Sequence, residues 1–310
     1  IVKTGYEFDS FCGGALVDMF SKTGNLDDAT RIFDDLIEPD TVSWTAMISG
    51  YVHAGFPEEA LELFEEMRSS GQVPDQVAFG TVINACVRHG RLDDAWRLFS
   101  DMPNKNVVTW NVMISGHCKV GYEMDAVKFF LDMIKAGIKP TRSTLGSVLS
   151  AIAGVASLEL GVQVHAKAMK QGLDANVYVG SSLINMYAKC KRMEAAKQVF
   201  NGVSEKNDVI WNALLGGYAQ NGHACEVVEL FTSMTIAGFQ HDEFTYTSIL
   251  SACSCLENVE MGCQLHSALI KRKYALNLFV GNALVDMYAK CGALKDARKQ
   301  FELMTTRDNV

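Results

Sequence analysis

The feature that most constrains the fold of this chain is a passage that occurs more than once. Residues 177–190 read VYVGSSLINMYAKC, residues 278–291 read LFVGNALVDMYAKC, and a looser copy at 10–22 reads SFCGGALVDMFSK. Related segments lie between these copies, beginning TVSWTAMISG at 41, VVTWNVMISG at 107 and DVIWNALLGG at 208. The chain is therefore an array of repeats, and a repeat period decides the fold class before any single residue does.

Each repeat contains two stretches in which apolar residues recur at helical spacing. In residues 278–308 the first stretch runs from about Gly281 to Cys291, Gly292 marks the turn, and the second stretch begins at about Leu294. Such a hairpin has too much apolar surface to stand alone, so we expect it to stack on its neighbours. The chain has only five prolines, which also suits an all-helical fold.

The repeats have two lengths, and both recur. Those of 35 residues are 41–75, 107–141, 142–176, 208–242 and 243–277. Those of 31 residues are 10–40, 76–106, 177–207 and 278–308. Two long repeats and one short repeat make the period of 101 residues that separates the two closest copies.

Composition narrows the classes of protein that fit. The apolar fraction of 48% and the charged fraction of 21% are typical of a globular chain. No apolar run approaches the ~20 residues that span a membrane. The nine cysteines form no disulfide framework, which favours a reducing compartment. The chain starts at Ile1 without a signal or transit peptide, so we expect it to begin inside a longer protein. Its net charge of −8 alone argues weakly against nucleic acid.

One short motif carries the beginning of a catalytic signature. His241-Asp242-Glu243 matches the H-x-E of zinc deaminases, but the P-C-x-x-C that completes that signature is absent. Asp242 also ends one repeat and Glu243 opens the next. No nucleophile triad, P-loop or glycine-rich dinucleotide motif occurs. We therefore predict no enzyme activity, no metal and no cofactor for these residues.

A 35-residue unit that opens V-x-W-x-x-M/L-I and closes G-x-x-P-D resembles the pentatricopeptide repeat family. Lengths of 35, 35 and 31 resemble its plant PLS subclass. The phrases that carry the resemblance are VVTWN at 107–111, LELGVQVH at 158–165 and LVDMYAKC at 284–291, and the likeness covers essentially the whole chain. It implies an all-α, right-handed α-solenoid superhelix of stacked helix-turn-helix repeats, with the first helices on the concave face.

The resemblance also assigns a type to each repeat. Residues 1–9 resemble the end of an L-type repeat, and residues 309–310 the start of another repeat. Between them the order is S (10–40), P (41–75), S (76–106), P (107–141), L (142–176), S (177–207), P (208–242), L (243–277) and S (278–308). An L-type repeat is missing between 75 and 76.

The family binds single-stranded RNA at one base per repeat, and the fifth and last residues of a repeat select the base. We call these two residues the base-selecting pair. The implied pairs are Thr45 with Asp75 for guanine, Asn111 with Thr141 weakly for a pyrimidine, Ser181 with Asn207 for adenine, Asn212 with Asp242 for uracil, Thr247 with Asn277 for adenine, and Asn282 with Asp308 for uracil. L-type repeats follow the rule poorly. Gly14, Gly80 and Gly146 leave three repeats without a selecting side chain. If the RNA runs parallel to the protein, its sequence is N-G-N-Y-N-A-U-(A)-U.

Two further columns support this interpretation. The second residue of most repeats is apolar or aromatic and could stack on bases; the column contains Phe11, Val42, Val77, Val108, Tyr178, Val209, Phe244 and Phe279. The thirteenth residue is often basic and could hold phosphate; the column contains Lys22, Arg88, Lys119, Lys189 and Lys290. Together these columns place a cationic stripe on one face of an acidic protein.

Simpler structural roles compete with each of these assignments. Asn and Thr at a fifth position could cap a helix, the apolar column could be core between repeats, and the lysines could be solvated surface. Trp44, Trp110 and Trp211 share the fourth position, where we predict core rather than a ligand platform. The recurrence of short polar residues in one register favours base selection.

The resemblance implies the recognition array of an organellar C-to-U RNA editing factor. The implied partners are a single-stranded organellar transcript, multiple organellar RNA editing factors and a deaminase domain that lies beyond residue 310 or acts in trans. The implied site is the mitochondrion of a plant cell, with the plastid (chloroplast) as the alternative. Two other functions stay open: an RNA stabilisation or splicing factor without editing, and a protein-binding scaffold like tetratricopeptide arrays, which have a period of about 34 and no two-position code.

Overall fold

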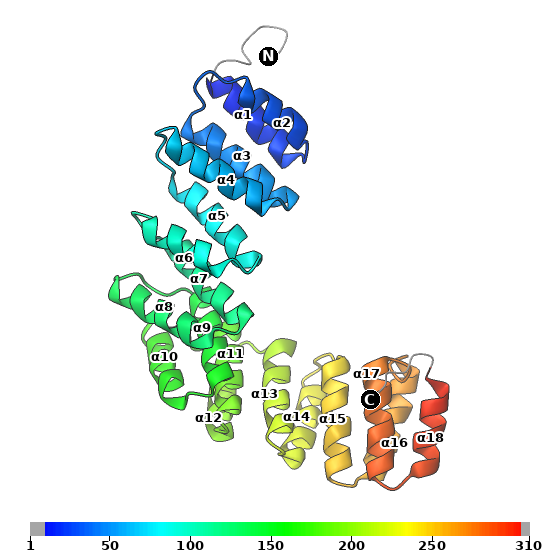
Figure 1. The fold of residues 1–310 in the computed structure, drawn as a ribbon. Coiled ribbons are helices and arrows are strands. Elements are labelled where there is room, and N and C mark those ends of the chain that lie inside the picture. Colours follow the sequence, from blue (N-terminus) through cyan, green and yellow to red (C-terminus); the bar gives the residue numbers. More distant parts are fainter. Residues whose placement is uncertain (1–9, 305–310) are drawn as a thin grey trace. The chain divides into compact units, whose positions relative to one another are not determined.

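The computed structural model describes residues 10–304, with the side chains of Ser10 and Phe11 excepted. Eighteen α-helices and no strand occupy this range. The helices are α1 (Ser10–Lys22), α2 (Leu26–Asp34), α3 (Thr41–Ala54), α4 (Pro57–Ser69), α5 (Gln76–Arg88), α6 (Leu92–Asp101), α7 (Val107–Val120), α8 (Glu123–Lys135), α9 (Arg142–Val155), α10 (Leu158–Lys170), α11 (Val177–Lys189), α12 (Met193–Gly202), α13 (Asp208–Gln220), α14 (Ala224–Ile236), α15 (Glu243–Cys255), α16 (Val259–Lys271), α17 (Leu278–Lys290) and α18 (Leu294–Leu303). The predicted all-α solenoid of helical hairpins is confirmed (Figure 1).

The chain divides into two compact units, residues 1–151 and 152–310. In the first unit, α1, α3, α5 and α7 pack on one another in that order, and α2, α4 and α6 each pack on their own first helix and on the next one. In the second unit, α11, α13, α15 and α17 repeat this arrangement (Figure 1). First helices thus form one layer in each unit and second helices the other.

The odd-numbered helices begin at the first residue of each repeat, because the last residue of the repeat before it caps them. The Asp40 carboxylate accepts a hydrogen bond from the Ser43 backbone N–H at 2.8 Å, and Asp75 accepts one from Ala78 at 2.7 Å. The same N-cap occurs at Asn106, Asn176, Asn207, Asp242 and Asn277. Fifth-position residues lie a full turn inside the helix, so the alternative that they cap it is wrong.

Aromatic pairs connect neighbouring repeats in the core. Trp44, Trp110 and Trp211 are only 6–8% exposed, which confirms the predicted core role. Each meets a phenylalanine of the preceding second helix edge-on, with ring centroids 4.8 Å apart; the partners are Phe33, Phe99 and Phe200. Between residues 10 and 304, no helix is long and apolar enough to cross a bilayer.

Candidate nucleic-acid interface

The second, fifth, ninth and thirteenth residues of a repeat share one face of its first helix. Each residue advances about 100° around an α-helix, so these four positions fall within a sector of about 80°. On α7 they are Val108, Asn111, Ser115 and Lys119. We call this surface the base-selecting face.

The apolar column on this face is exposed to solvent. Among the described side chains at the second position, the exposed fraction lies between 46% and 67%; they are Val42, Val77, Val108, Tyr178, Val209, Phe244 and Phe279. The alternative that this column is buried core between repeats is therefore wrong. An exposed apolar group recurring once per repeat can stack on bases. Phe11 belongs to the column by sequence, but its side chain lies outside the described residues.

The base-selecting pair of repeat 41–75 is in contact across thirty residues of sequence. The Thr45 hydroxyl donates to Asp75 Oδ1 at 3.5 Å, a long hydrogen bond. The same Oδ1 atom receives the capping N–H of Ala78. Asp75 Oδ2 makes no hydrogen bond among residues 10–304, and Asp75 is exposed. A carboxylate oxygen is thus available to an N–H donor on this face.

The pair of repeat 208–242 is held more tightly. Asn212 Nδ2 donates to Asp242 Oδ2 at 2.9 Å, while Asp242 Oδ1 accepts the capping N–H of Thr245 at 2.8 Å. The Thr245 hydroxyl donates to Asn212 Oδ1 at 2.9 Å. The Asn212 amide is therefore oriented from both ends, and its second N–H is left for a ligand.

The pair of repeat 107–141 follows the same plan with a hydroxyl in place of the carboxylate. Asn111 Nδ2 donates to Thr141 Oγ1 at 3.3 Å, and the Thr144 hydroxyl donates to Asn111 Oδ1 at 2.6 Å. Sequence reasoning missed Thr144 and Thr245, the third residues of the following repeats. A polar residue three positions after an N-cap is a capping-box signal, and it would have identified both.

Two other predicted pairs are not joined by a hydrogen bond. The hydroxyls of Ser181 and Thr247 each donate to a backbone carbonyl three residues earlier on their own helix, at 3.0 Å in both cases. Asn207 caps α13, and Asn277 caps α17 while donating to Glu243 at 2.8 Å. The partners share the face but each is engaged elsewhere.

The remaining predicted positions differ in what surrounds them. Asn282 lies on α17, and its partner Asp308 lies outside the described residues. A side chain added at Gly14 would meet the Ser43 hydroxyl at 2.6 Å, whereas one added at Gly80 would only touch Thr109 at 3.7 Å. Gly146 is buried on α9.

The basic column is exposed along its length, but its members differ in pairing. Lys22 forms an ion pair with Asp18 at 2.7 Å and Lys290 with Asp286 at 2.9 Å. The hydrogen bond from Lys290 to Asp286 raises the pKa of the lysine. No ion pair within the described range engages the other three members, Arg88, Lys119 and Lys189. These three are the groups best able to contact phosphate.

The H-x-E motif has no metal-binding geometry. His241 is buried, stacks on Phe231 with centroids 4.5 Å apart, and faces the Thr235 hydroxyl at 3.1 Å. Burial lowers the pKa of its imidazole. No group of three metal-ligating side chains exists in the described part of the chain.

Family models match most of the chain. The model described as PPR repeat family matches residues 39–88, 74–107, 105–154 and 206–255, and the PPR repeat model matches 14–38, 181–207, 244–274 and 282–309. The chain belongs to the pentatricopeptide repeat (PPR) family. The matched segments include residues of all nine predicted repeats, although repeat 142–176 is matched only as far as residue 154.

PPR proteins of Arabidopsis thaliana are similar to this chain over its whole length. The mitochondrial pentatricopeptide repeat-containing protein At3g09040 is 57% identical over 310 residues, which are 100% of this chain and 30% of that protein. The chloroplastic protein At1g11290 is 31% identical over 342 residues, with coverage of 99% and 42%. The chain thus spans less than half the length of these two curated relatives.

A solved PPR structure shares the fold. PPR10 in complex with an 18-nucleotide psaJ RNA element superposes with a TM-score of 0.57 at 18% identity, over 95% of this chain and 50% of that one. At this identity the likeness establishes the fold of the PPR array.

Proposed function

We propose that this PPR array binds single-stranded RNA in a sequence-specific way, one base per repeat. The observation that carries the proposal is the base-selecting pair, which is hydrogen-bonded in repeats 41–75, 107–141 and 208–242 beside an exposed apolar side chain. PPR10, which has the same fold, is bound to RNA in its crystal structure. The proposed sequence is N-G-N-Y-N-A-U-(A)-U, read 5′ to 3′.

The proposed guanine pair suits guanine for a chemical reason. The Watson–Crick edge of guanine presents two N–H donors, and Asp75 keeps Oδ2 available to accept one of them. A carboxylate cannot donate, so it disfavours bases that present an acceptor at that place. The Thr45 hydroxyl donates a hydrogen bond to the other carboxylate oxygen, Asp75 Oδ1.

The proposed uracil pair has the complementary arrangement. The free N–H of the Asn212 amide can donate to a uracil carbonyl, and Asp242 can accept from the N3–H beside it, directly or through water. The exposed Val209 belongs to the same repeat and the exposed Phe244 to the next one, and their side chains can enclose the base. In repeats 177–207 and 243–277, Ser181 and Thr247 would have to leave their backbone partners to contact a base.

We further propose that the array belongs to the PLS subclass and serves as the recognition part of a mitochondrial C-to-U editing factor. The alternation of 35- and 31-residue repeats supports the subclass, and the similarity to the mitochondrial At3g09040 supports the organelle. Editing requires a deaminase domain outside these residues or in trans. Multiple organellar RNA editing factors are the proposed protein partners. RNA protection without editing is the alternative that a complementation assay of editing would distinguish.

Anisotropy of a labelled nine-nucleotide RNA tests the RNA-binding proposal. The proposed sequence should bind more tightly than RNAs in which its G becomes A, or its seventh base U becomes C, by about tenfold each. Affinity should fall as salt rises. Equal affinity for all three RNAs would rule out base selection, and no binding at low salt would favour a protein-binding scaffold.

A further inference from the structure

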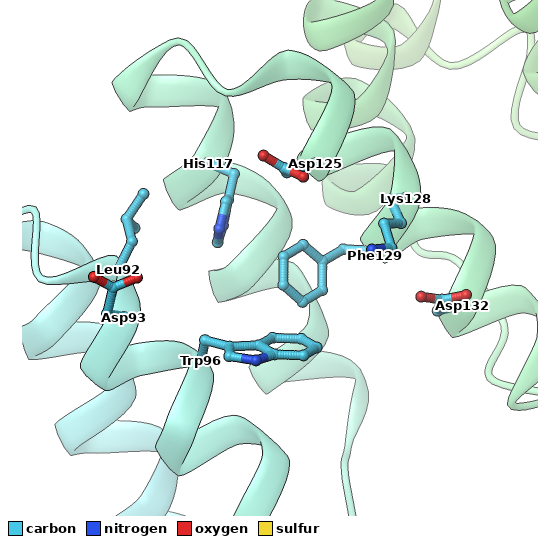
Figure 2. A pocket seen from close by; sticks show the side chains of 8 residues that line it. All are labelled: Leu92, Asp93, Trp96, His117, Asp125, Lys128, Phe129 and Asp132. Carbon is cyan, nitrogen blue, oxygen red and sulfur yellow. The ribbon is translucent and has the colours of Figure 1, made fainter.

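A hollow of about 200 Å³ lies between the second helices of repeats 76–106 and 107–141, away from the base-selecting face. Trp96 of α6, Phe129 of α8 and His117 of α7 surround it (Figure 2). His117 follows Val108 by nine residues, so it points about 180° away from that member of the apolar column. Nothing in the proposed RNA contact uses this hollow.

The aromatic part of the hollow is continuous and open to a ligand. Trp96 is 53% exposed, and its ring meets that of Phe129 edge-on with centroids 5.4 Å apart. The His117 ring lies 4.7 Å from the Phe129 ring. The other three tryptophans of the chain are buried, so Trp96 is the exception. An exposed indole face attracts cations.

The polar groups around these rings accept hydrogen bonds and carry negative charge. Asp93, Asp125 and Asp132 line the hollow (Figure 2), and only Lys128 opposes them. Asp132 is paired with Lys135 at 3.0 Å, but Asp93 and Asp125 form no ion pair with any described residue. The hollow therefore favours a cation and disfavours RNA phosphate.

His117 adds a buried acceptor. Its Nδ1 lies 2.8 Å from the Met113 carbonyl oxygen, which can only accept, so Nδ1 carries a proton and, in the neutral imidazole, Nε2 carries the lone pair. The side chain is 8% exposed and points into the hollow (Figure 2). No hydrogen bond to Nε2 occurs among residues 10–304. A donor from a ligand would satisfy this nitrogen.

An equivalent hollow one period later provides a comparison inside the same chain. It lies between α12 and α14, and six of its lining positions are those of the first hollow offset by 101 residues. Lys197 replaces Trp96, Leu230 replaces Phe129, and Tyr218 replaces His117. The second hollow has lost both the exposed indole and the imidazole, whereas it keeps an acidic side chain, Glu226, in place of Asp125. The aromatic lining is therefore specific to the first hollow rather than a consequence of the fold.

We propose that the Trp96 hollow binds an arginine side chain of a partner protein. A guanidinium is planar and can lie on the indole while its N–H groups point sideways at Asp93, Asp125 and His117 Nε2. Lysine has no planar group to stack in this way. The site would hold a protein on the second-helix layer while the first-helix layer is occupied by RNA.

The four indole N–H signals of the full chain, labelled with ¹⁵N-tryptophan, provide the test. N-acetyl-L-arginine amide should shift the Trp96 signal saturably and leave those of Trp44, Trp110 and Trp211 in place. N-acetyl-citrulline amide has nearly the same shape without the charge, so it should cause no saturable shift. The lysine analogue should bind about fivefold more weakly than the arginine amide.

Two variants complete the test. The first is the double variant Asp93→Asn/Asp125→Asn, in which the Trp96 indole N–H signal still reports binding. It should weaken the arginine amide about fivefold. Trp96→Lys introduces the residue of the equivalent hollow and removes the indole signal. Binding of the arginine amide to this variant is therefore measured by saturation-transfer NMR of the ligand. The variant should bind the arginine amide no more tightly than the wild type binds the citrulline amide. Both variants should retain the wild-type affinity for RNA. An equal response to citrulline would overturn the proposal, and so would a Trp96 shift caused by single-stranded RNA, which would make the hollow part of the RNA path.

Discussion

Repeats 208–242 and 177–207 have the same first-helix register, but the side chains of their base-selecting pairs form different hydrogen bonds. In the first, Asn212 is fixed between Asp242 and Thr245 before any ligand arrives. In the second, the Ser181 hydroxyl donates to its own helix and Asn207 serves only the cap. A preorganised group loses little freedom on binding, whereas an engaged one must first break its bond. Repeats 41–75, 107–141 and 208–242, whose pairs are hydrogen-bonded, should therefore contribute most of the base discrimination, and the other repeats less.

Replacing Asp242 with Asn should produce the largest change in base preference. The carboxylate can only accept from uracil N3–H, whereas an amide can donate to the N3 acceptor of cytosine. We expect the preference between U and C at the seventh base to change by about tenfold. Binding of the two RNAs to the variant and the wild type measures it. Since Asn also caps helices, unchanged stability is expected, and an unchanged U preference would contradict the assignment of the pair.

Replacing Thr245 with Val should loosen the same pair indirectly. The buried hydroxyl lies 2.9 Å from Asn212 Oδ1 and 2.8 Å from Asp242 Oδ1, so its single proton is shared between these two acceptors. Its loss should lower the free energy of unfolding by about 1–2 kcal/mol and weaken discrimination at the seventh base. Thr247→Val is the matched control for stability and for discrimination at the seventh base, because that hydroxyl bonds only a carbonyl of its own helix and is assigned to the eighth base. Urea denaturation and RNA titration should show larger effects for Thr245→Val than for Thr247→Val. Equal effects would refute the idea that the Thr245 hydroxyl fixes the Asn212–Asp242 pair.

Replacing Lys119 with Ala should weaken binding to every RNA sequence alike. This lysine has no ion pair in the described range, so we expect the affinity to fall a few-fold and the slope of log affinity against log salt concentration to become shallower by about 0.7. Lys290 is the comparison, since its ammonium already faces Asp286. Lys290→Ala should have the smaller effect. The slopes of affinity against salt concentration decide between them, and the reverse order would show that the local pairing has no influence.

The smallest effect should come from adding a selecting side chain where the sequence has none. Gly80→Thr would face Asn106, the last residue of its repeat, and the only contact of its Cβ at 3.7 Å is an ordinary one. We expect a preference of about two- to threefold for adenine at the third base. The substitution should leave stability unchanged or raise it, because glycine inside a helix is unfavourable. Four RNAs that differ only at that base provide the measurement.

The repeat period was enough to predict the helical hairpins, because apolar spacing and turn glycines are local signals. The tryptophan positions were predictable for the same reason. Other contacts depend on side-chain conformations, which a column of equivalent residues does not reveal. Examples are the ion pair between Lys22 and Asp18 and the hydrogen bond from Thr144 to Asn111. Capping by the fifth residue was only the alternative that the sequence left open, and the structure gives capping to the last residue of the preceding repeat. The Trp96 hollow was not foreseen at all, since its lining comes from three helices.

The last residue of each repeat faces two demands at once. Asp75 and Asp242 must start the next helix, and in our proposal they must also name a base. Only residues with a short side-chain oxygen cap a helix well: Asp, Asn, Ser and Thr, in the main. Helix stability thus restricts the second residue of the base-selecting pair to these few residue types. In our proposal, a substitution of one capping residue for another at that position changes the preferred base while the helix, and with it the fold, is retained.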